Sequence, residues 1–373
     1  MIIKGMDTVH VRVPLEEPYV FQRGRMDAFE SVIVRIVTDT GVTGFGENAP
    51  LFRSQNTPAS IKKVLDEKIR EFLVGKNPMN IEMLVEEVLR RTNGNVDVLA
   101  GVDLALWDIM GKSLGKSVFE LLGGCCQDPI AVDYTLSAEE PGEMARTASR
   151  LCGEGYRGVV VKITGKSIDE DARRVRAVRD ALSPESTVRV DCNGAYSAED
   201  AIDFLGKIRD LDIEFVEQPV PAADMEGLIA SRRAGIPIVV DESLKTMQEA
   251  LSLVAKGACD VMNIKVANVG GLLMAKRMAA IASAAGLPVV VGGRTSLEIS
   301  RCASRHFAAS TYGAIGRKHE GPGPASQSLT DDVVTERVTV ESAAAAGGYV
   351  RVSKNPGLGA NVVWDKVMHY ARS

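Results

Sequence analysis

The segment GVVVKITGK (residues 158–166) holds the pattern that decides the fold. Its three consecutive valines are typical of a buried β-strand, because branched side chains pack well on a pleated sheet. The strand is expected to end at Lys162, and Lys166 follows in the turn beyond it. A buried ammonium group is costly unless it is paired. We therefore expect Lys162 to lie close to negative partners, and Lys166 to be solvated.

The same pattern, an apolar strand that ends in a charge, recurs four times further along the chain. The runs VRVD, EFVE, IVVD and MNIK end at residues 191, 217, 241 and 265. From residue 162 onward, the charged residues are 29, 26, 24 and 24 residues apart, which suits one strand and one helix per interval. Any one of these charges could simply begin a loop. Five such charges at nearly regular intervals predict that they lie together at one end of a sheet.

The alternation of strands and helices predicts the architecture. From about residue 128, continuous apolar strands alternate with helical patterns, as in a parallel sheet covered by helices. The number of such units favours a closed barrel, with an open doubly wound sheet as the alternative. The first fifty residues resemble a β-meander, helical patterns follow, and the alternation stops again near the C-terminus. We expect an N-terminal α+β domain over 1–127, a barrel over 128–325, and a returning C-terminal segment over 326–373.

Composition and charge argue against several classes of function. The net charge of −5 and the absence of basic runs argue against a nucleic-acid partner. No stretch approaches 18 apolar residues and the N-terminus lacks a signal-peptide core, so we expect a cytoplasmic protein without a membrane partner. The six cysteines include no CxxC pair, which predicts free thiols, and the four histidines include no HExxH motif.

Three of the five charges are carboxylates, at Asp191, Glu217 and Asp241. In a barrel, the carboxyl ends of the strands form the active-site face, so these groups would converge and raise one another's pKa unless a cation joins them. Oxygen ligands without Cys or His select a hard cation, and we expect one Mg²⁺ per site, or Mn²⁺ in its place. Lys162 and Lys265 would flank this ion.

This arrangement suggests proton abstraction next to a carboxylate. A lysine near a divalent cation loses its proton more readily and can act as a general base near neutral pH. The metal would bind a substrate carboxylate and stabilise the negative charge that develops when the α-proton leaves. The expected partner is therefore a small-molecule carboxylate.

At these residues the chain resembles the enolase superfamily, and within it the muconate-lactonizing-enzyme subgroup. The similarity extends over essentially the whole chain, in the motifs VDCNG, VEQP, VDES, NIKVANVGG, EGPGP and PGLG. The resemblance implies a modified TIM barrel of the (β/α)7β type with an α+β capping domain built from the N-terminal region and the C-terminal tail. It also implies site roles: metal ligands at Asp191, Glu217 and Asp241, an acid–base pair at Lys162 and Lys265, and supporting groups at Asn193 and Glu242.

The chain departs from the subgroup pattern in two places. The subgroup usually carries Lys-x-Lys where this chain has Val160 and Lys162, and period-two geometry puts both positions on one face of the strand. Without a neighbouring lysine, either the metal and Lys265 lower the pKa of the base, or the base is less acidic than is usual in the subgroup. The seventh strand is followed by Arg294 and Ser296, where relatives often place methionine and glutamate. It carries no histidine, which argues against the mandelate-racemase-like subgroup.

Substrate contacts are predicted from loops that close over the barrel mouth in this superfamily. Solvated loops with packing aromatics are the alternative for the capping-domain positions. The candidates are Tyr19, Phe21, Arg23 and Phe52 from the capping domain, and Arg294, Ser296 and Glu320 from the barrel.

With a lysine on each face of the substrate, racemisation or epimerisation is the expected outcome. The subgroup implies an amino-acid derivative as substrate: a dipeptide, an N-acylated amino acid or a proline-type compound. Dehydration of a β-hydroxy acid, such as a 3-hydroxyproline or an acid sugar, and cycloisomerisation share the same first step and stay open. A non-catalytic binding protein should have lost a ligand or a lysine, and none is lost. A homo-oligomer is also expected.

Overall fold

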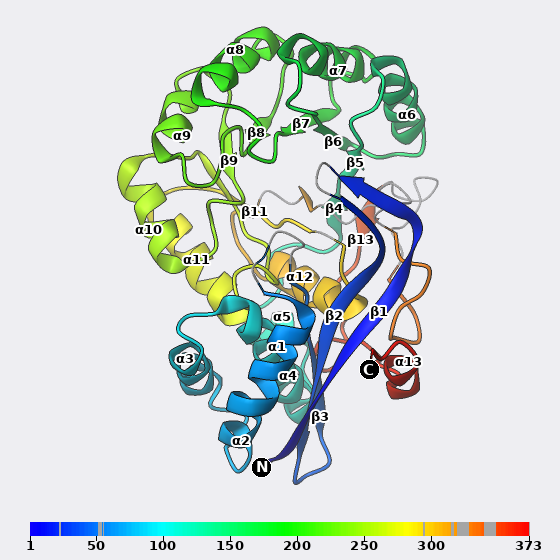
Figure 1. The fold of residues 1–373 in the computed structure, drawn as a ribbon, viewed down its shortest axis with the longest axis vertical. Coiled ribbons are helices and arrows are strands. Elements are labelled where there is room, and N and C mark those ends of the chain that lie inside the picture. Colours follow the sequence, from blue (N-terminus) through cyan, green and yellow to red (C-terminus); the bar gives the residue numbers. More distant parts are fainter. Residues whose placement is uncertain are drawn as a thin grey trace.

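The structure is a computed structural model that describes residues 1–21, 24–50, 54, 56–293, 295–314, 317–318, 328–338 and 348–372. Figure 1 shows two parts, a curled parallel sheet ringed by helices and a long antiparallel sheet beside it. This arrangement confirms the predicted fold class. The boundaries placed at residues 127 and 325 stay predictions.

The N-terminal part is an antiparallel sheet with helices packed against it. Its strands are β1 (Ile3–Phe21), β2 (Gly24–Thr38) and β3 (Thr43–Asn48), in that order. The helices are α1 (Pro58–Val64), a π-helical turn (Leu65–Ile69), α2 (Arg70–Leu73), α3 (Ile81–Arg91), α4 (Val96–Leu114) and α5 (Val118–Leu121). The small residues of α4 let it approach β3 closely: a Cβ at Gly46 would lie 1.8 Å from the carbonyl oxygen of Gly101. Glycine is required there because any side chain would collide with the helix backbone.

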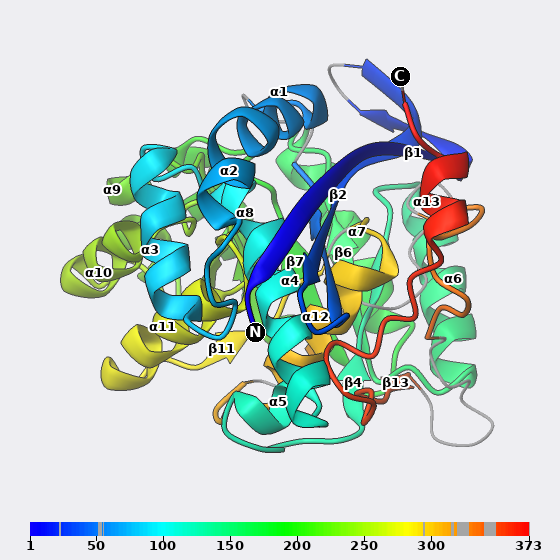
Figure 2. The same ribbon diagram turned by 90° about the horizontal axis from the view of Figure 1, so that it is seen from below.

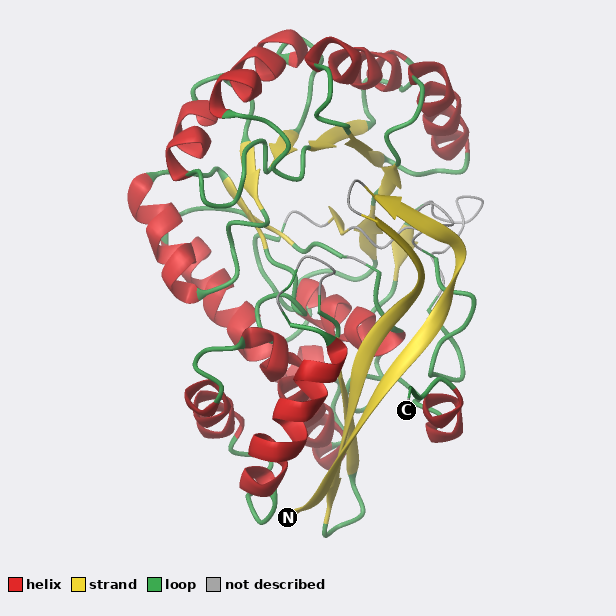
Figure 3. Cartoon of the chain, viewed as in Figure 1, coloured by secondary structure: helices red, strands yellow, loops and turns green. Residues whose placement is uncertain are grey.

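In the second part, the described residues form a seven-stranded parallel sheet in simple sequential order. Its strands are β5 (Tyr134–Leu136), β6 (Gly158–Lys162), β7 (Thr187–Asp191), β8 (Phe215–Glu217), β9 (Ile238–Val240), β10 (Val261–Asn263) and β11 (Val289–Val290). Figure 3 shows the helices on the outer, convex side of this sheet. They are α6 (Pro141–Gly153), α7 (Ile168–Asp180), α8 (Ala198–Ile208), α9 (Met225–Arg232), α10 (Met247–Lys256) and α11 (Leu272–Ala284). The next helix, α12 (Glu298–Ala309), lies beside α5 at the open side of the curled sheet (Figure 1).

The C-terminal segment lies against the N-terminal sheet, as Figure 2 shows for α13 (Trp364–His369) and β1. The backbone N–H of Arg12 donates to the carbonyl of Tyr370 at 2.9 Å, and that of Arg372 donates to the carbonyl of His10 at 2.7 Å. A small sheet of β12 (Arg317–Lys318), β4 (Ile130–Val132) and β13 (Tyr349–Val350) joins distant parts of the chain. All six cysteines are free thiols, as predicted. Within the described ranges, no helix has the length and apolarity needed to span a membrane.

Carboxylates from distant segments cap two helices of the second part. Glu47, in β3, accepts hydrogen bonds from the backbone N–H groups of Leu297 and Ser300, both at 3.0 Å. Asp332 accepts from the N–H of Glu298 at 3.0 Å in the same helical turn. The first turn of a helix has unsatisfied N–H groups and a partial positive charge, so a carboxylate there is stabilising. These caps tie the beginning of α12 to the N-terminal sheet and to the C-terminal segment.

Asp103, in α4, caps α11 in the same way. Its carboxylate accepts from the N–H groups of Leu272 at 2.5 Å and Leu273 at 3.3 Å. Burial raises the pKa of Asp103 and of Glu47 to about 7, and raises the pKa of Asp332 to about 6. These three carboxyl groups therefore make stability depend on pH near neutrality.

We expect the free energy of unfolding to decrease as the pH rises from about 4.5 to about 7. In that window the folded chain still holds protons on Glu47, Asp103 and Asp332 that the unfolded chain has released, so raising the pH favours unfolding. Urea unfolding at pH 5 and pH 8 measures the change. Glu47→Gln, which cannot ionise, should show a smaller difference between the two pH values. An equal difference in the wild type and the variant would contradict this expectation.

Candidate active site

The five predicted charges lie at the carboxyl end of the parallel sheet. Lys162, Asp191 and Glu217 are the last residues of β6, β7 and β8, and they are paired in register across the three strands. Asp241 directly follows β9, and Lys265 lies two residues beyond β10. Paired residues of neighbouring parallel strands point to the same side of a sheet. The structure thus brings together charges that are spread over about a hundred residues of sequence.

The two lysines contact the carboxylates from opposite ends of the row. The Lys162 ammonium donates to Asp191 Oδ2 and, at 2.9 Å, to Asn193 Oδ1. The Lys265 ammonium donates to Asp241 Oδ2 at 2.5 Å and lies 3.8 Å from Glu217 Oε1. Three strands, β7 to β9, lie between β6, which ends in Lys162, and β10, which precedes Lys265.

Neighbouring groups fix the side chains around Lys265. Asn263, two residues earlier on β10, donates its side-chain amide to Glu217 Oε1 at 2.9 Å. The backbone of Gly292, which follows β11, packs directly on this pair. A Cβ at Gly292 would lie 2.2 Å from Asn263 Oδ1 and 2.7 Å from Lys265 Cε. Glycine at this position therefore leaves the space that the lysine side chain needs.

The predicted supporting groups, Asn193 and Glu242, are in contact with each other. The side-chain amide of Asn193 donates to Glu242 Oε1 at 3.1 Å, and its backbone N–H donates to Asp191 Oδ1 at 2.9 Å. Asn193 adopts a positive φ of 46°, which asparagine tolerates better than most residues. It thereby reaches Lys162, Asp191 and Glu242 at once.

Electrostatics among these groups is dominated by burial and by the gathered carboxylates. Burial lowers the pKa of both Lys162 and Lys265, but the neighbouring carboxylates outweigh it and raise both values. Burial raises the pKa of Asp241, and burial together with the charge of Asp241 raises the pKa of Glu242 to about 7. Among protein groups alone, both lysines are therefore held as ammonium ions.

The donor set fits a hard cation, although the side chains are not gathered as metal ligands. Among the described residues, no group of three or more His, Cys, Asp and Glu side chains is arranged to hold a metal ion. Instead the ammonium groups of Lys162 and Lys265 lie on Asp191 and Asp241. Three buried carboxylates at adjacent strand ends still form an oxygen-rich set of the kind that Mg²⁺ prefers. Burial and the charge of Asp191 raise the pKa of Cys192 well above its usual range, so its thiol does not compete as a thiolate ligand.

A buried arginine, which the sequence analysis did not single out, lies next to Val160. Val160 is buried and pairs in register with Arg189 of β7, one layer below Lys162 and Asp191. The Arg189 guanidinium is fully buried and contacts Asp133 at 2.6 Å and Glu214 at 2.7 Å. The strand β6 thus has valine where the subgroup has its first lysine, and the neighbouring strand β7 carries a buried cation, Arg189, at the paired position. The alternation of TVRVD, with Arg189 two residues before Asp191, is the signal that could have revealed it.

Replacing Val160 by lysine is expected to destabilise the fold. The new ammonium would lie in register beside Arg189, whose guanidinium already engages Asp133 and Glu214. A buried charge without a partner destabilises by about 3–5 kcal/mol. Urea unfolding measures the effect, and Val160→Met controls for the added length without the charge. A Val160→Lys protein as stable as Val160→Met would contradict this expectation.

Only some of the predicted substrate-contact residues lie within the part of the chain that the structure describes. Arg23, Phe52, Arg294 and Glu320 lie outside the described residues. Tyr19 and Phe21 lie at the end of β1, where their backbones pair with Met26 and Gly24, and their side chains are outside what is described. Ser296 is buried and directly precedes Leu297, which Glu47 holds. These residues stay predictions as substrate contacts.

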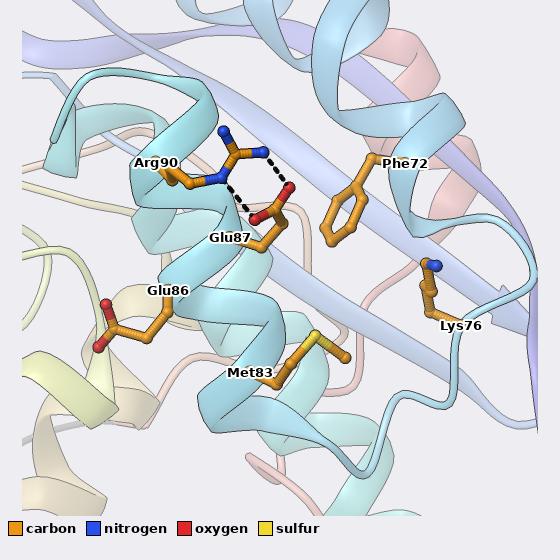
Figure 4. Close-up of a pocket in the computed structure, with 6 residues that line it drawn as sticks. All are labelled: Phe72, Lys76, Met83, Glu86, Glu87 and Arg90. Carbon is orange, nitrogen blue, oxygen red and sulfur yellow. Dashed lines mark hydrogen bonds and ion pairs between the residues drawn. The ribbon is translucent and has the colours of Figure 1, made fainter.

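A surface pocket of about 520 Å³ lies elsewhere, beside α3 (Figure 4). Arg90 donates to Glu87 within it at 2.6 Å and 2.8 Å, and Glu86 pairs with Arg277 outside it. None of the predicted site residues lines it; its lining is formed by Phe72, Lys76, Met83, Glu86, Glu87 and Arg90. The strand ends are therefore the better candidate for chemistry.

Two family models and several known proteins match this chain. Residues 3–123 match the mandelate racemase / muconate lactonizing enzyme N-terminal domain, and residues 143–366 match the enolase C-terminal domain-like family. The N-succinyl-L-Arg/Lys racemase of Bacillus cereus is 30% identical over 98% of this chain and 96% of its own. The cis-3-hydroxy-L-proline dehydratase of Roseibium aggregatum is 30% identical over 98% of this chain and 97% of its own. Chloromuconate cycloisomerases also match.

Solved structures are also similar to this chain over nearly its whole length. The dipeptide epimerase of Enterococcus faecalis V583, complexed with Mg and the dipeptide L-Leu-L-Tyr, superposes with a TM-score of 0.88 at 30% sequence identity. The match covers 97% of this chain and 100% of the epimerase chain.

Proposed function

This chain belongs to the mandelate racemase/muconate lactonizing enzyme family of the enolase superfamily, and from that premise we propose that it inverts the α-carbon of a small carboxylate. The observation that carries the proposal is the pair Lys162 and Lys265. Their ammonium groups contact opposite ends of a row of three buried carboxylates. A substrate held at that row would present one face to each lysine.

Asp191, Glu217 and Asp241 would hold Mg²⁺, or Mn²⁺ in its place, as the Mg-complexed dipeptide epimerase suggests. The bound ion would supply positive charge that orients the substrate carboxylate and stabilises the negative charge developing on it. Carboxylates engaged by a cation stabilise the ammonium forms of Lys162 and Lys265 less, so the pKa of each lysine falls toward neutral pH. One lysine can then be neutral while the other stays protonated.

The proton transfer uses both lysines in sequence. The neutral lysine accepts the α-proton from one face, and its amine becomes an ammonium ion. The ammonium of the other lysine donates a proton to the opposite face of the same carbon, and it becomes neutral. The α-carbon is inverted with no net change in the number of protons. Reversal of the two roles converts the product back.

An amino-acid derivative is the proposed substrate class: a dipeptide, an N-acylated amino acid or a proline-type compound. Support comes from the names of the relatives, an N-succinyl-Arg/Lys racemase and a dipeptide epimerase. Dehydration is the second candidate, because the similar 3-hydroxyproline dehydratase covers nearly the whole chain. If the substrate carries a β-hydroxyl, the electron pair left by the α-proton would form a double bond while the C–O bond breaks. A lysine ammonium would protonate the departing oxygen to give water.

The proposal is tested by incubating the protein with Mg²⁺ in D₂O and a panel of candidate substrates, followed by NMR. The panel contains dipeptides, N-acyl amino acids, proline analogues and acid sugars. Epimerisation exchanges the α-proton and inverts the centre, whereas dehydration gives an unsaturated or keto product. Absence of α-proton exchange across the whole panel, with metal binding verified, would contradict the proposal.

A further inference from the structure

Gln218 follows Glu217 at the end of β8 and is fully buried. Its side-chain oxygen accepts hydrogen bonds from the backbone N–H groups of Asp241 at 3.0 Å and Ser243 at 3.2 Å. Its side-chain amide donates to the carbonyl of Val220 at 2.9 Å and to the hydroxyl of Ser243 at 2.8 Å. Both polar atoms of the side chain are therefore fully used, as buried amides require.

The backbone of Gln218 is held on both sides as well. Its N–H donates to the carbonyl of Val239 in β9 at 2.8 Å, and its carbonyl accepts from the N–H of Gly194, beyond β7, at 2.7 Å. Its φ is 41°, a left-handed conformation that residues with a side chain rarely adopt. Such a conformation persists where surrounding contacts over-determine it, and these positions cluster at functional sites.

The contacts of Gln218 meet at the point where the regular sheet stops. The last residue of β9 is Val240, so Asp241 lies just beyond the strand. The Gln218 side-chain oxygen accepts a hydrogen bond from the N–H of Asp241 at this position, beyond the last residue of the strand. The main chain of Asp241 is thereby fixed relative to Glu217, the residue next to Gln218.

We propose that Gln218 is a positioning residue that holds three carboxylates, Asp191, Glu217 and Asp241, in the relative placement needed to bind a divalent cation. It acts through three strand ends: Gly194 after β7, Glu217 on β8 and Asp241 after β9. This inference rests on the proposed function, which assigns the cation to these carboxylates. Partners that hold metal ligands in place matter for affinity, and their loss typically weakens metal binding by about 10–100-fold.

Two variants separate positioning from general stability. Gln218→Met keeps the approximate length of the side chain and removes all four of its hydrogen bonds. Ser231→Ala is the matched control, since it removes a fully buried hydroxyl in α9 that bonds only within that helix, to the carbonyl of Gly227 at 2.8 Å. Should Gln218→Met fail to fold, Ser243→Ala serves instead. It removes the hydroxyl that accepts a hydrogen bond from the Gln218 side-chain amide, and it leaves the side chain of Gln218 in place.

The measurement is Mg²⁺ affinity of the substrate-free protein by calorimetry, with Mn²⁺ binding by electron paramagnetic resonance as a second readout. Gln218→Met should bind at least about tenfold more weakly, whereas Ser231→Ala should bind like the wild type even if both melt at lower temperatures. Ser243→Ala should also bind more weakly than the wild type. Unchanged affinity in a folded Gln218→Met or Ser243→Ala protein would overturn this inference and leave the proposed function standing. A wild type that binds neither metal would overturn both.

Discussion

Substitution of Lys265 by alanine is expected to separate proton exchange from inversion. In the proposed mechanism each lysine serves one face of the substrate, so Lys265→Ala still removes an α-proton that faces Lys162 but cannot deliver one from the other side. Inversion should fall by roughly 10³-fold, as for the loss of a general acid or base. Exchange should persist for one stereoisomer only, and Lys162→Ala should show it for the other. NMR in D₂O follows exchange, and chiral separation follows inversion.

Lys166→Ala is the matched control for these variants, because Lys166 is exposed four residues after Lys162. It should leave both exchange and inversion unchanged. Since Lys265 pairs with the buried Asp241, circular dichroism in the presence of Mg²⁺ would verify that Lys265→Ala is folded. Full inversion by folded Lys162→Ala or Lys265→Ala would contradict the two-lysine mechanism.

Substitution of Glu217 by glutamine is expected to remove nearly all activity by weakening cation binding. Glu217 is the middle carboxylate of the row and is 1% exposed. Glutamine at this position has nearly the same shape but no charge. If the cation supplies several kcal/mol of transition-state stabilisation, the rate should fall by roughly 10³-fold or more. Calorimetry with Mg²⁺ and α-proton exchange measure the two effects.

Glu214→Gln is the control for the loss of one negative charge on the same segment. Glu214 contacts Arg189 and lies just before β8, whereas Glu217 is the last residue of that strand. This variant should retain Mg²⁺ binding. Wild-type Mg²⁺ affinity in Glu217→Gln would show that the three carboxylates do not hold the cation.

The sequence was sufficient to predict the parallel sheet and the charges at its carboxyl end. Each of these features depends on local pattern: a run of branched residues, a charge at its end and a regular interval to the next run. Lys162, Asp191 and Glu217 end their strands as predicted and pair in register. Lys166 is exposed, as expected for a turn residue.

Features that depend on long-range pairing could not be predicted in the same way. The charge pattern predicts negative partners for Lys162, and its ammonium lies on Asp191, but the pairing of each lysine with one particular carboxylate depends on how the strand ends meet. Glu47 caps a helix that begins about 250 residues later in the chain, a contact that no local pattern specifies. Gln218 is another example, because the partners of a buried amide depend on which strand ends meet around it.

The most direct test of the two-lysine account is the position of deuterium during early turnover in D₂O with Mg²⁺. The starting material should be a single stereoisomer of a substrate from the panel, and samples should be taken before a tenth of it is converted. If one lysine removes the proton and the other delivers a solvent-derived deuteron, the inverted product carries deuterium at its α-carbon from the first turnovers. Inverted product that retains the α-proton of the starting substrate would contradict the account.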